Sequence, residues 1–220
     1  IHDKVLERVS NIREVTSFRQ RRSWAVGSMT LHDLQLLDCG SWFLHQDPFR
    51  CVRGGKLSPE EQASYKGLPL TTLEQALHLI KSHGWMLNVE VKDVGSKRNH
   101  ILVDRICSLI RELGLTRQVL LSSLRFETLE AIRDKGSDFN LAFVDSVVHP
   151  QVLRRLQTIQ ATAYHPKHTL IRPDVIRSCR NQGIAVNAWT VNRMTDLRLL
   201  QAMGVDGIIT DVPQRMHSMR

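Results

Sequence analysis

The sequence has few cysteines, few aromatic residues and no long hydrophobic run. Its four cysteines contain no Cys-x-x-Cys pair, which disfavours a disulfide framework and favours reduced thiols. No stretch of 18 apolar residues suggests a membrane span, and no charged-then-apolar signal peptide opens the chain. We therefore expect a cytoplasmic protein without a transmembrane segment, although the first residue is Ile1 rather than Met.

Charge of one sign is in excess, since 30 basic residues face 22 acidic ones for a net charge of +8. The basic residues are scattered, and aromatic residues, 5% of the chain, do not interleave with them as they do on base-stacking surfaces. We expect no nucleic-acid partner, and a basic surface that helps to attract a small anionic substrate. No pattern in the sequence indicates the oligomeric state.

From Thr71 onward, helical and strand patterns alternate. Glycines follow the predicted helices, Pro173 suits a first helical turn, and Thr195 is a candidate N-cap for the last helix, which Gly204 would end. Six strands separated by helices predict parallel β-α units, in a closed barrel or a doubly wound sheet. The predicted strands are Met86–Lys92, Val119–Ser123, Asn140–Val144, Ala161–His165, Ala185–Val191 and Gly207–Thr210. Helices are predicted at 101–113, 127–135 and 150–156, among others.

The first 70 residues have a different character. Leu31–Leu37 has a helical pattern, whereas residues 44–67 are rich in glycine, proline and charge and lack an apolar period. We interpret residues 44–67 as a surface excursion near the site.

The strand Leu87–Lys92 carries the strongest chemical signal. Alternate strand residues face opposite sides, so Asn88, Glu90 and Lys92 share a face that a parallel sheet normally fills with apolar residues. Barrel enzymes place catalytic groups at the C-terminal ends of strands. A carboxylate there suits a hard divalent cation and an ammonium suits a phosphate oxygen, but an ordinary Glu–Lys pair on an exposed edge strand fits the pattern equally well.

Five segments in order resemble the glycerophosphodiester phosphodiesterase family. Val89-Glu90-Val91-Lys92 resembles its central Glu-x-Lys strand, and Ile1–Arg8 resembles its His-Asp motif. The other three are Leu37–Phe43, similar to a Leu-Asp-Ala-Gly-x-Trp-Phe segment; Leu68–Glu74, similar to a Pro-Thr-Leu-Glu helix start with two residues inserted; and Val186–Asn192 with Gly204–Pro213, similar to the C-terminal signature.

The resemblance implies an α/β fold of the TIM-type (β/α) barrel class and a metal-dependent hydrolysis of glycerophosphodiesters to sn-glycerol 3-phosphate and an alcohol. It implies His2 as a catalytic acid or base, Glu90 as a ligand of a divalent cation (Mg2+ or Ca2+), and Lys92 as the lysine that contacts the phosphate. Trp189 would line the substrate cleft or, equally, pack inside the barrel.

The family's His-Arg pair and Glu-x-Asp ligands should precede His2, where this sequence has only Ile1. We therefore expect one incomplete phosphodiesterase domain over residues 1–220, with about six of eight parallel strands, in an open sheet. Such a chain alone would bind metal poorly and be nearly inactive.

Alternatives remain at the level of sequence. A lysophospholipase D or a sphingomyelinase D-like enzyme could use the same scaffold, and a truncated barrel could serve as a non-catalytic binding module. Elsewhere, His165 and His168 could ligate zinc, although Pro166 between them favours a strand-end loop and no third ligand is suitably spaced. Ser122-Ser123 is better explained as a polar strand end than as a nucleophile, and Asp211 as a structural cap.

Overall fold

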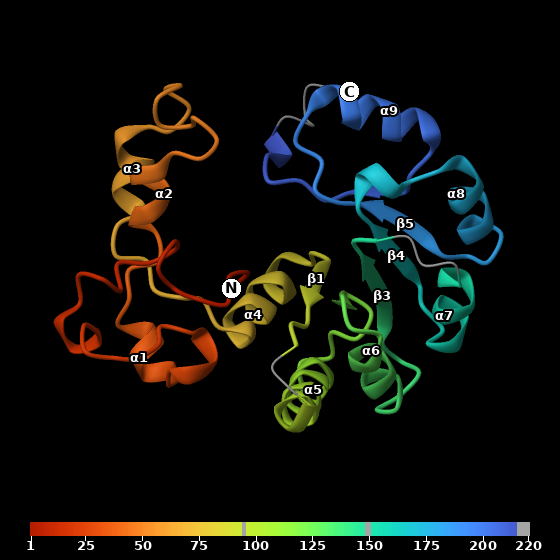
Figure 1. Cartoon of the computed structure of the whole chain (residues 1–220), viewed down its shortest axis with the longest axis horizontal. Helices are drawn as coiled ribbons and strands as arrows, with labels where there is room; N and C mark the ends of the chain where they lie inside the picture. The colour runs from red at the N-terminus through yellow and green to blue at the C-terminus, as the bar shows by residue number, and fades with distance from the viewer. Residues whose placement is uncertain (94–95, 148–150, 215–220) are drawn as a thin grey trace. The chain divides into compact units, whose positions relative to one another are not determined.

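The computed structural model describes residues 1–93, 96–147 and 151–214, without the side chains of 96–98. These residues form two compact units, which divide at Leu73. Figure 1 shows both units. The predicted helix start at Pro150 lies outside the described residues.

The larger unit alternates helices and strands, as the sequence predicts. Its strands are β1 (Leu87–Glu90), β2 (Val119–Ser123), β3 (Asn140–Asp145), β4 (Ala163–Pro166), β5 (Ala185–Ala188) and β6 (Gly207–Ile208). Its helices are α4 (Leu73–His83), α5 (Ser96–Glu112), α6 (Phe126–Arg133), α7 (Val152–Thr158), α8 (Pro173–Arg180) and α9 (Met194–Met203), with a short 3-10 helix at His168–Leu170.

The six strands form one parallel sheet in chain order, from β1 to β6. Within the described residues, β1 pairs only with β2 and β6 only with β5. In the part of the chain that the structure describes, no backbone ladder joins the two ends, so the expected open, six-stranded part of a TIM-type barrel is confirmed.

The two faces of the curved sheet differ in chemistry. The outer face carries buried Leu121, Leu141 and Val186, and the ring of Phe143 contacts that of Phe126 from α6. Figure 1 shows α5 to α8 along this convex side. Register and alternation assign Glu90 and Ser122 to the opposite, inner face, so the side covered by helices holds the hydrophobic core and the inner side holds polar residues.

Helix ends follow local rules in some cases and not in others. Pro173 opens α8 and Gly204 ends α9 in the left-handed conformation, as predicted. Thr195, however, is not the N-cap of α9: Arg193 is, and the Thr195 hydroxyl bonds to the carboxylate of the next residue, Asp196.

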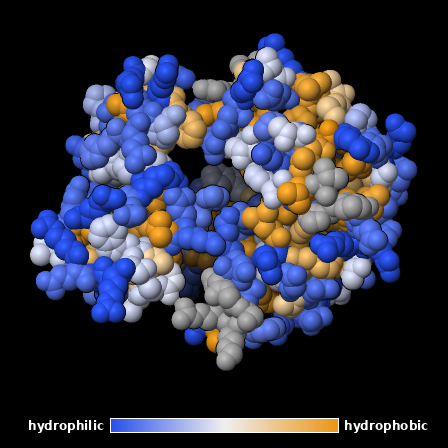
Figure 2. All heavy atoms as spheres, viewed as in Figure 1, coloured by the Kyte–Doolittle hydropathy of each residue, from blue (hydrophilic) through white to orange (hydrophobic). Residues whose placement is uncertain are grey.

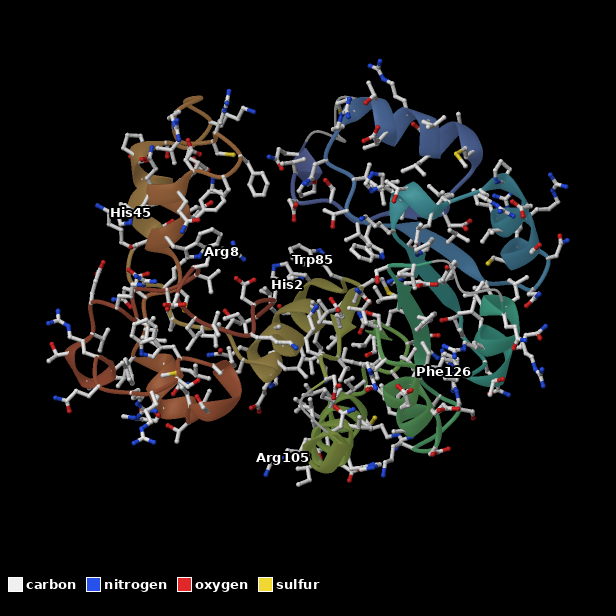
Figure 3. All side chains as sticks on the ribbon, viewed as in Figure 1. His2, Arg8, His45, Trp85, Arg105 and Phe126 are labelled. Carbon is white, nitrogen blue, oxygen red and sulfur yellow. The ribbon has the colours of Figure 1, made fainter. Side chains whose placement is uncertain are left out.

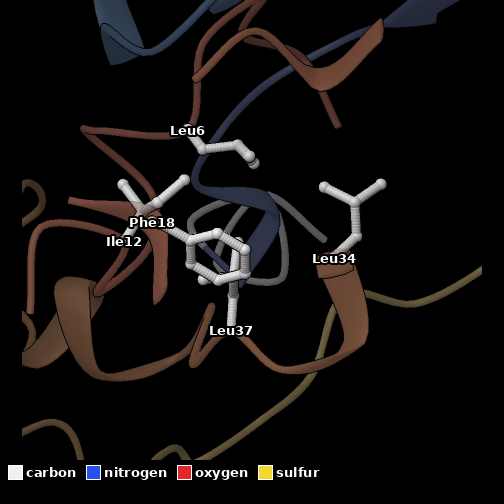
Figure 4. Close-up of a cluster of buried hydrophobic side chains, with 5 residues drawn as sticks. All are labelled: Leu6, Ile12, Phe18, Leu34 and Leu37. Carbon is white, nitrogen blue, oxygen red and sulfur yellow. The ribbon is translucent and has the colours of Figure 1, made fainter. Parts of the chain in front are cut away.

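The smaller unit has its own hydrophobic core, drawn in Figure 4. Its five buried members come from loops, from the 3-10 helix Thr16–Phe18, and from α1 (Leu31–Gln35) or the residues after it: Leu6, Ile12, Phe18, Leu34 and Leu37. Two further helices, α2 (Ser41–Gln46) and α3 (Pro59–Ser64), follow α1 in the chain. The 3-10 helices Thr16–Phe18 and Val26–Ser28 precede it. The excursion at residues 44–67 therefore contains a helix that the sequence analysis did not predict. Whether 1–220 is a single domain stays a prediction.

Candidate active site

Glu90 and Lys92 lie together at the C-terminal end of β1. The Lys92 Nζ is 2.6 Å from Glu90 Oε1, and both side chains are about one-third exposed. Alternation of the strand puts them on the same face, because they are two residues apart. Each charge satisfies the other while both remain partly accessible to a ligand, an arrangement that can receive an anionic oxygen at Lys92 and a cation at Glu90.

Small residues continue from Glu90 across the inner face. In register, Glu90 lies beside Ser122, Ser122 beside Ala142, and Ala142 beside Ala163. The interior of a TIM barrel is usually dominated by bulky branched side chains. Small side chains here leave the polar groups as the chemically distinctive feature of the face.

His165 and Asn187 form a second polar pair on this inner face. His165 follows Ala163 by two residues on β4, is 1% exposed, and places its Nε2 3.0 Å from Asn187 Nδ2 on β5. Burial lowers the pKa of His165 to about 4, so its ring is neutral near neutral pH.

Trp189 is fixed beside the same pair. Its indole Nε1 donates to the backbone carbonyl of His165 at 2.8 Å, and its own carbonyl accepts from the amide of His168 at 2.7 Å. The side chain is half-buried, so both readings of Trp189, cleft lining and barrel packing, remain open.

His165 and His168 have different partners, which bears on the weak zinc hypothesis. His168 Nδ1 lies 3.3 Å from the Trp189 carbonyl, whereas the His165 ring is paired with Asn187. Among the described residues, no group of three His, Cys, Asp or Glu side chains could hold a metal ion. Strand β4 ends at Pro166, as the strand-end reading predicts.

His2 belongs to the smaller unit, where it is highly exposed and labelled in Figure 3. Its Nδ1 is 3.2 Å from Asp3 Oδ1, and Arg8 donates to both oxygens of Asp3 at 2.6 and 2.8 Å. The Arg8 hydrogen bond lowers the pKa of Asp3 to about 2. Asp3 is thus ionised near neutral pH and orients the ring of His2. The convergence of His2 with Glu90 and Lys92 stays a prediction, because His2 belongs to the smaller unit and the other two residues belong to the larger one.

Comparison with known proteins assigns the chain. A model of the Glycerophosphoryl diester phosphodiesterase family matches residues 1–215. The chain belongs to this family. A glycerophosphodiester phosphodiesterase of Caldanaerobacter subterraneus is 23% identical over 216 residues, covering 98% of this chain and 77% of the relative. One from Bacillus subtilis is 25% identical over 230 residues, covering all of this chain and 71% of the relative.

Solved structures of the family share the fold. A phosphodiesterase from Oleispira antarctica, in complex with the product sn-glycerol-3-phosphate, gives a TM-score of 0.78 at 18% identity, covering 99% of this chain and 77% of that one. A glycerophosphodiester phosphodiesterase from Agrobacterium tumefaciens gives 0.66 at 19% identity, covering 96% and 76%. The chain is therefore a phosphodiesterase of the glycerophosphodiester family on a TIM-type scaffold.

The sequence analysis missed the pairing of His165 with Asn187. Both are polar residues within predicted strands. A search for polar residues on the strand face that carries Glu90 could therefore have selected them. Their pairing depends on the register between β4 and β5, which is not visible in the sequence.

Proposed function

We propose that the enzyme hydrolyses glycerophosphodiesters to sn-glycerol 3-phosphate and an alcohol, using Glu90, Lys92 and His2. The observation that supports the proposal most directly is the Glu90–Lys92 pair, with Nζ and Oε1 2.6 Å apart, at the C-terminal end of a strand in a family of phosphodiesterases. Barrel enzymes place their chemistry at this end of the strands.

The chain's own residues divide the work by charge. Lys92 binds a non-bridging phosphoryl oxygen and stabilises the negative charge that develops as water attacks phosphorus. His2 donates Nδ1–H to the Asp3 carboxylate, so its Nε2 is the atom that exchanges a proton with the leaving oxygen or the attacking water. The phosphorus–oxygen bond to the alcohol breaks, and the alcohol leaves as its oxygen gains the proton.

A divalent cation, Mg2+ or Ca2+, is part of the proposal with Glu90 as one ligand. When bound, such an ion neutralises charge on the phosphoryl oxygens. Calcium takes six to eight oxygen ligands, yet the described residues offer no cluster of three ligating side chains, and Glu90 Oε1 already accepts from Lys92. These residues alone do not form a cation site, so a cation at Glu90 needs ligands beyond them.

Small soluble diesters are favoured over lipid substrates by the excursion at residues 44–67. It contains none of the exposed large hydrophobic side chains of the structure. A surface that takes up an acyl chain would present apolar side chains. Within the described residues, no helix has the length and hydrophobicity needed to cross a bilayer.

The test uses protein expressed from the whole reading frame that contains this sequence. Glycerophosphocholine and glycerophosphoethanolamine are supplied as substrates, and sn-glycerol 3-phosphate is measured with its NAD-linked dehydrogenase. We expect turnover that a chelator removes and Mg2+ or Ca2+ restores. Hydrolysis of lysophosphatidylcholine or sphingomyelin in preference to these diesters would replace the proposal with a lipid phosphodiesterase, and binding without turnover would indicate a binding module.

A further inference from the structure

His165 has one ring nitrogen whose role the proposed mechanism leaves unassigned. Its Nε2 lies 3.0 Å from Asn187 Nδ2, while Nδ1 is buried without a hydrogen-bond partner among the described residues. Buried polar side-chain atoms in folded proteins nearly always have a partner, so an exception requires an explanation.

The contact with Asn187 determines which nitrogen carries the proton. The Nδ2 group of an asparagine only donates, so Nε2 of His165 must accept. In a neutral imidazole the other nitrogen then carries the hydrogen, and burial keeps this ring neutral. The atom without a partner is therefore an uncharged N–H donor.

Neighbouring residues hold this donor in a fixed direction. Asn187 Oδ1 fills the space where a side chain at Gly207 would begin, so the glycine permits the asparagine to lie in this position. The backbone of His165 is held separately, because its carbonyl accepts the indole Nε1–H of Trp189. Both the ring and the main chain of His165 are thus restrained.

The surroundings of this N–H suit an oxygen acceptor that is bound in the site. The inner face carries Ala142 and Ala163 where larger side chains are usual, although Val144 lies beside His165 in register. The hydroxyl of buried Ser122 likewise has no partner among the described residues. His165 is 1% exposed, so bulk water does not supply the missing partner.

We propose that His165 is a substrate-binding residue whose Nδ1–H donates to an oxygen of the sn-glycerol 3-phosphate half of the substrate. This inference rests on the proposed function. The N–H is neutral, so it binds either a glycerol hydroxyl or a phosphoryl oxygen without adding charge, in contrast to Lys92. Asn187 is then a positioning residue, which selects the tautomer that can donate.

The first test observes the ring directly. Long-range 15N–1H spectra of the histidines should show His165 as the Nδ1–H tautomer. Adding sn-glycerol 3-phosphate should shift its Nδ1 resonance. Parallel titrations with inorganic phosphate and with glycerol identify which half supplies the oxygen. If none of the three ligands moves the resonance and Nδ1–H shows contact with a bound water, the proposal is overturned.

The second test compares variants of the complete enzyme. In His165→Asn the side-chain amide can place a donor near the original Nδ1 position, whereas His165→Leu removes the donor. We expect His165→Leu to raise KM for glycerophosphocholine about tenfold, a typical effect of one lost hydrogen bond, and His165→Asn to recover most of it. His78→Asn, on the exposed face of α4, is the control and should behave as wild type.

Failure of the inference and failure of the proposed function are distinguishable. An active enzyme in which both His165 variants have wild-type KM and kcat refutes the role of His165 and leaves the function standing. A protein that hydrolyses no glycerophosphodiester, but whose His165 resonance shifts with sn-glycerol 3-phosphate, refutes the function and supports the binding role. If His165→Leu does not fold, the titration of the wild-type ring still decides.

Discussion

The carboxylate of Glu90 and the ammonium of Lys92 form an ion pair with 2.6 Å between Oε1 and Nζ. From this contact we predict the effect on activity of changing one residue of the pair. Glu90→Gln keeps the shape of the side chain but removes its charge. We expect kcat/KM for glycerophosphocholine to fall by about 100-fold or more, as when a group that supports transition-state charge is lost. The response to added Mg2+ or Ca2+ should weaken as well.

The matched control is Glu127→Gln. Glu127 lies in the first turn of α6, is largely exposed and pairs with Arg125 at 3.4 Å, so the same chemical change occurs at an exposed ion pair that has no role in the proposed chemistry. Wild-type activity is expected there. Equal rates and equal chelator sensitivity in Glu90→Gln and wild type would remove Glu90 from the site.

A second residue-level prediction concerns pH and His165. Burial lowers its pKa from 6.5 to about 4 in the folded protein, so the unfolded chain binds the extra proton first. The stability linked to this residue is full above about pH 6.5 and is lost as the pH falls toward 4. The shift corresponds to on the order of 3 kcal/mol. Urea unfolding at pH 7 and pH 4.5 should show a smaller loss for His165→Asn than for wild type.

Asp3 titrates over a lower pH range than His165, so its protonation does not affect the comparison of urea unfolding at pH 7 and pH 4.5. Hydrogen bonds from Arg8 lower its pKa from 3.8 to about 2. Its contribution is therefore present above about pH 4 and is lost between pH 4 and 2. A stability curve that is flat from pH 7 to 4.5 would contradict the buried, neutral state of His165.

At the scale of elements, local sequence signals predicted the strands better than the helix starts. Short apolar runs between the predicted helices located all six strands, but β5 ends at Ala188 instead of Val191, where an isolated bridge from Trp189 to Lys167 replaces the ladder. The strand's apolar pattern continues beyond its pairing partner. The length of a strand therefore depends on the neighbouring strand with which it pairs and cannot be predicted from its own sequence alone.

Helix α5 begins at Ser96, five residues before the predicted start at Ile101. Two other differences between the predicted and the observed helices, at α9 and α3, have different physical causes. Helix α9 starts at Met194 because Leu197 and Leu200 pack against Ala188 and Val191, and this packing prevails over a cap at Thr195. Helix α3, in contrast, has a start signal in its own sequence. Ser58 and Glu61 form a reciprocal capping box, with Pro59 in the first turn, and this pattern predicts a helix start.

The candidate site was predictable to the extent that it lies on one strand. Glu90 and Lys92 are two residues apart, so alternation alone places them on one face. His165 and Asn187 are 22 positions apart and meet only through the register of β4 with β5, where Tyr164 lies beside Val186. No local pattern encodes that register.

An element-level prediction follows from the end of α4. Gly84 has φ +64°, and a side chain there would meet nothing within 4 Å, so only the backbone conformation opposes substitution. We expect Gly84→Ala to lower the free energy of unfolding by about 1 kcal/mol. Gly27→Ala is the control, since it also has open space but no positive φ. Equal stability of the two variants in urea titrations would contradict the left-handed helix end.

At the scale of the whole molecule, the sheet of the larger unit has two ends that no described strand covers. Strand β1 pairs on one side with β2, and β6 pairs on one side with β5. Unpaired strand edges bind other chains readily, because their amides and carbonyls lack partners. At the start of β1 this edge is accompanied by Trp85 and Met86, which are 56% and 69% exposed.

We therefore expect the 220-residue chain to self-associate, and the association to respond to charge at β1. A lysine next to an open edge disfavours pairing with another strand, because its charge would be buried. Met86→Lys should lower the apparent mass in light scattering after size exclusion, at equal protein concentration. Leu199→Lys is the matched control: Leu199 is 62% exposed on the helix α9 and belongs to neither edge strand, so the same charge there should leave association unchanged. Figure 2 shows hydrophobic as well as hydrophilic residues on the visible face of the larger unit, so the Leu199→Lys control is needed to separate general surface hydrophobicity from the strand edge. A chain that stays monomeric at high concentration, or one in which both lysine variants dissociate equally, would show that the edge of β1 does not drive association.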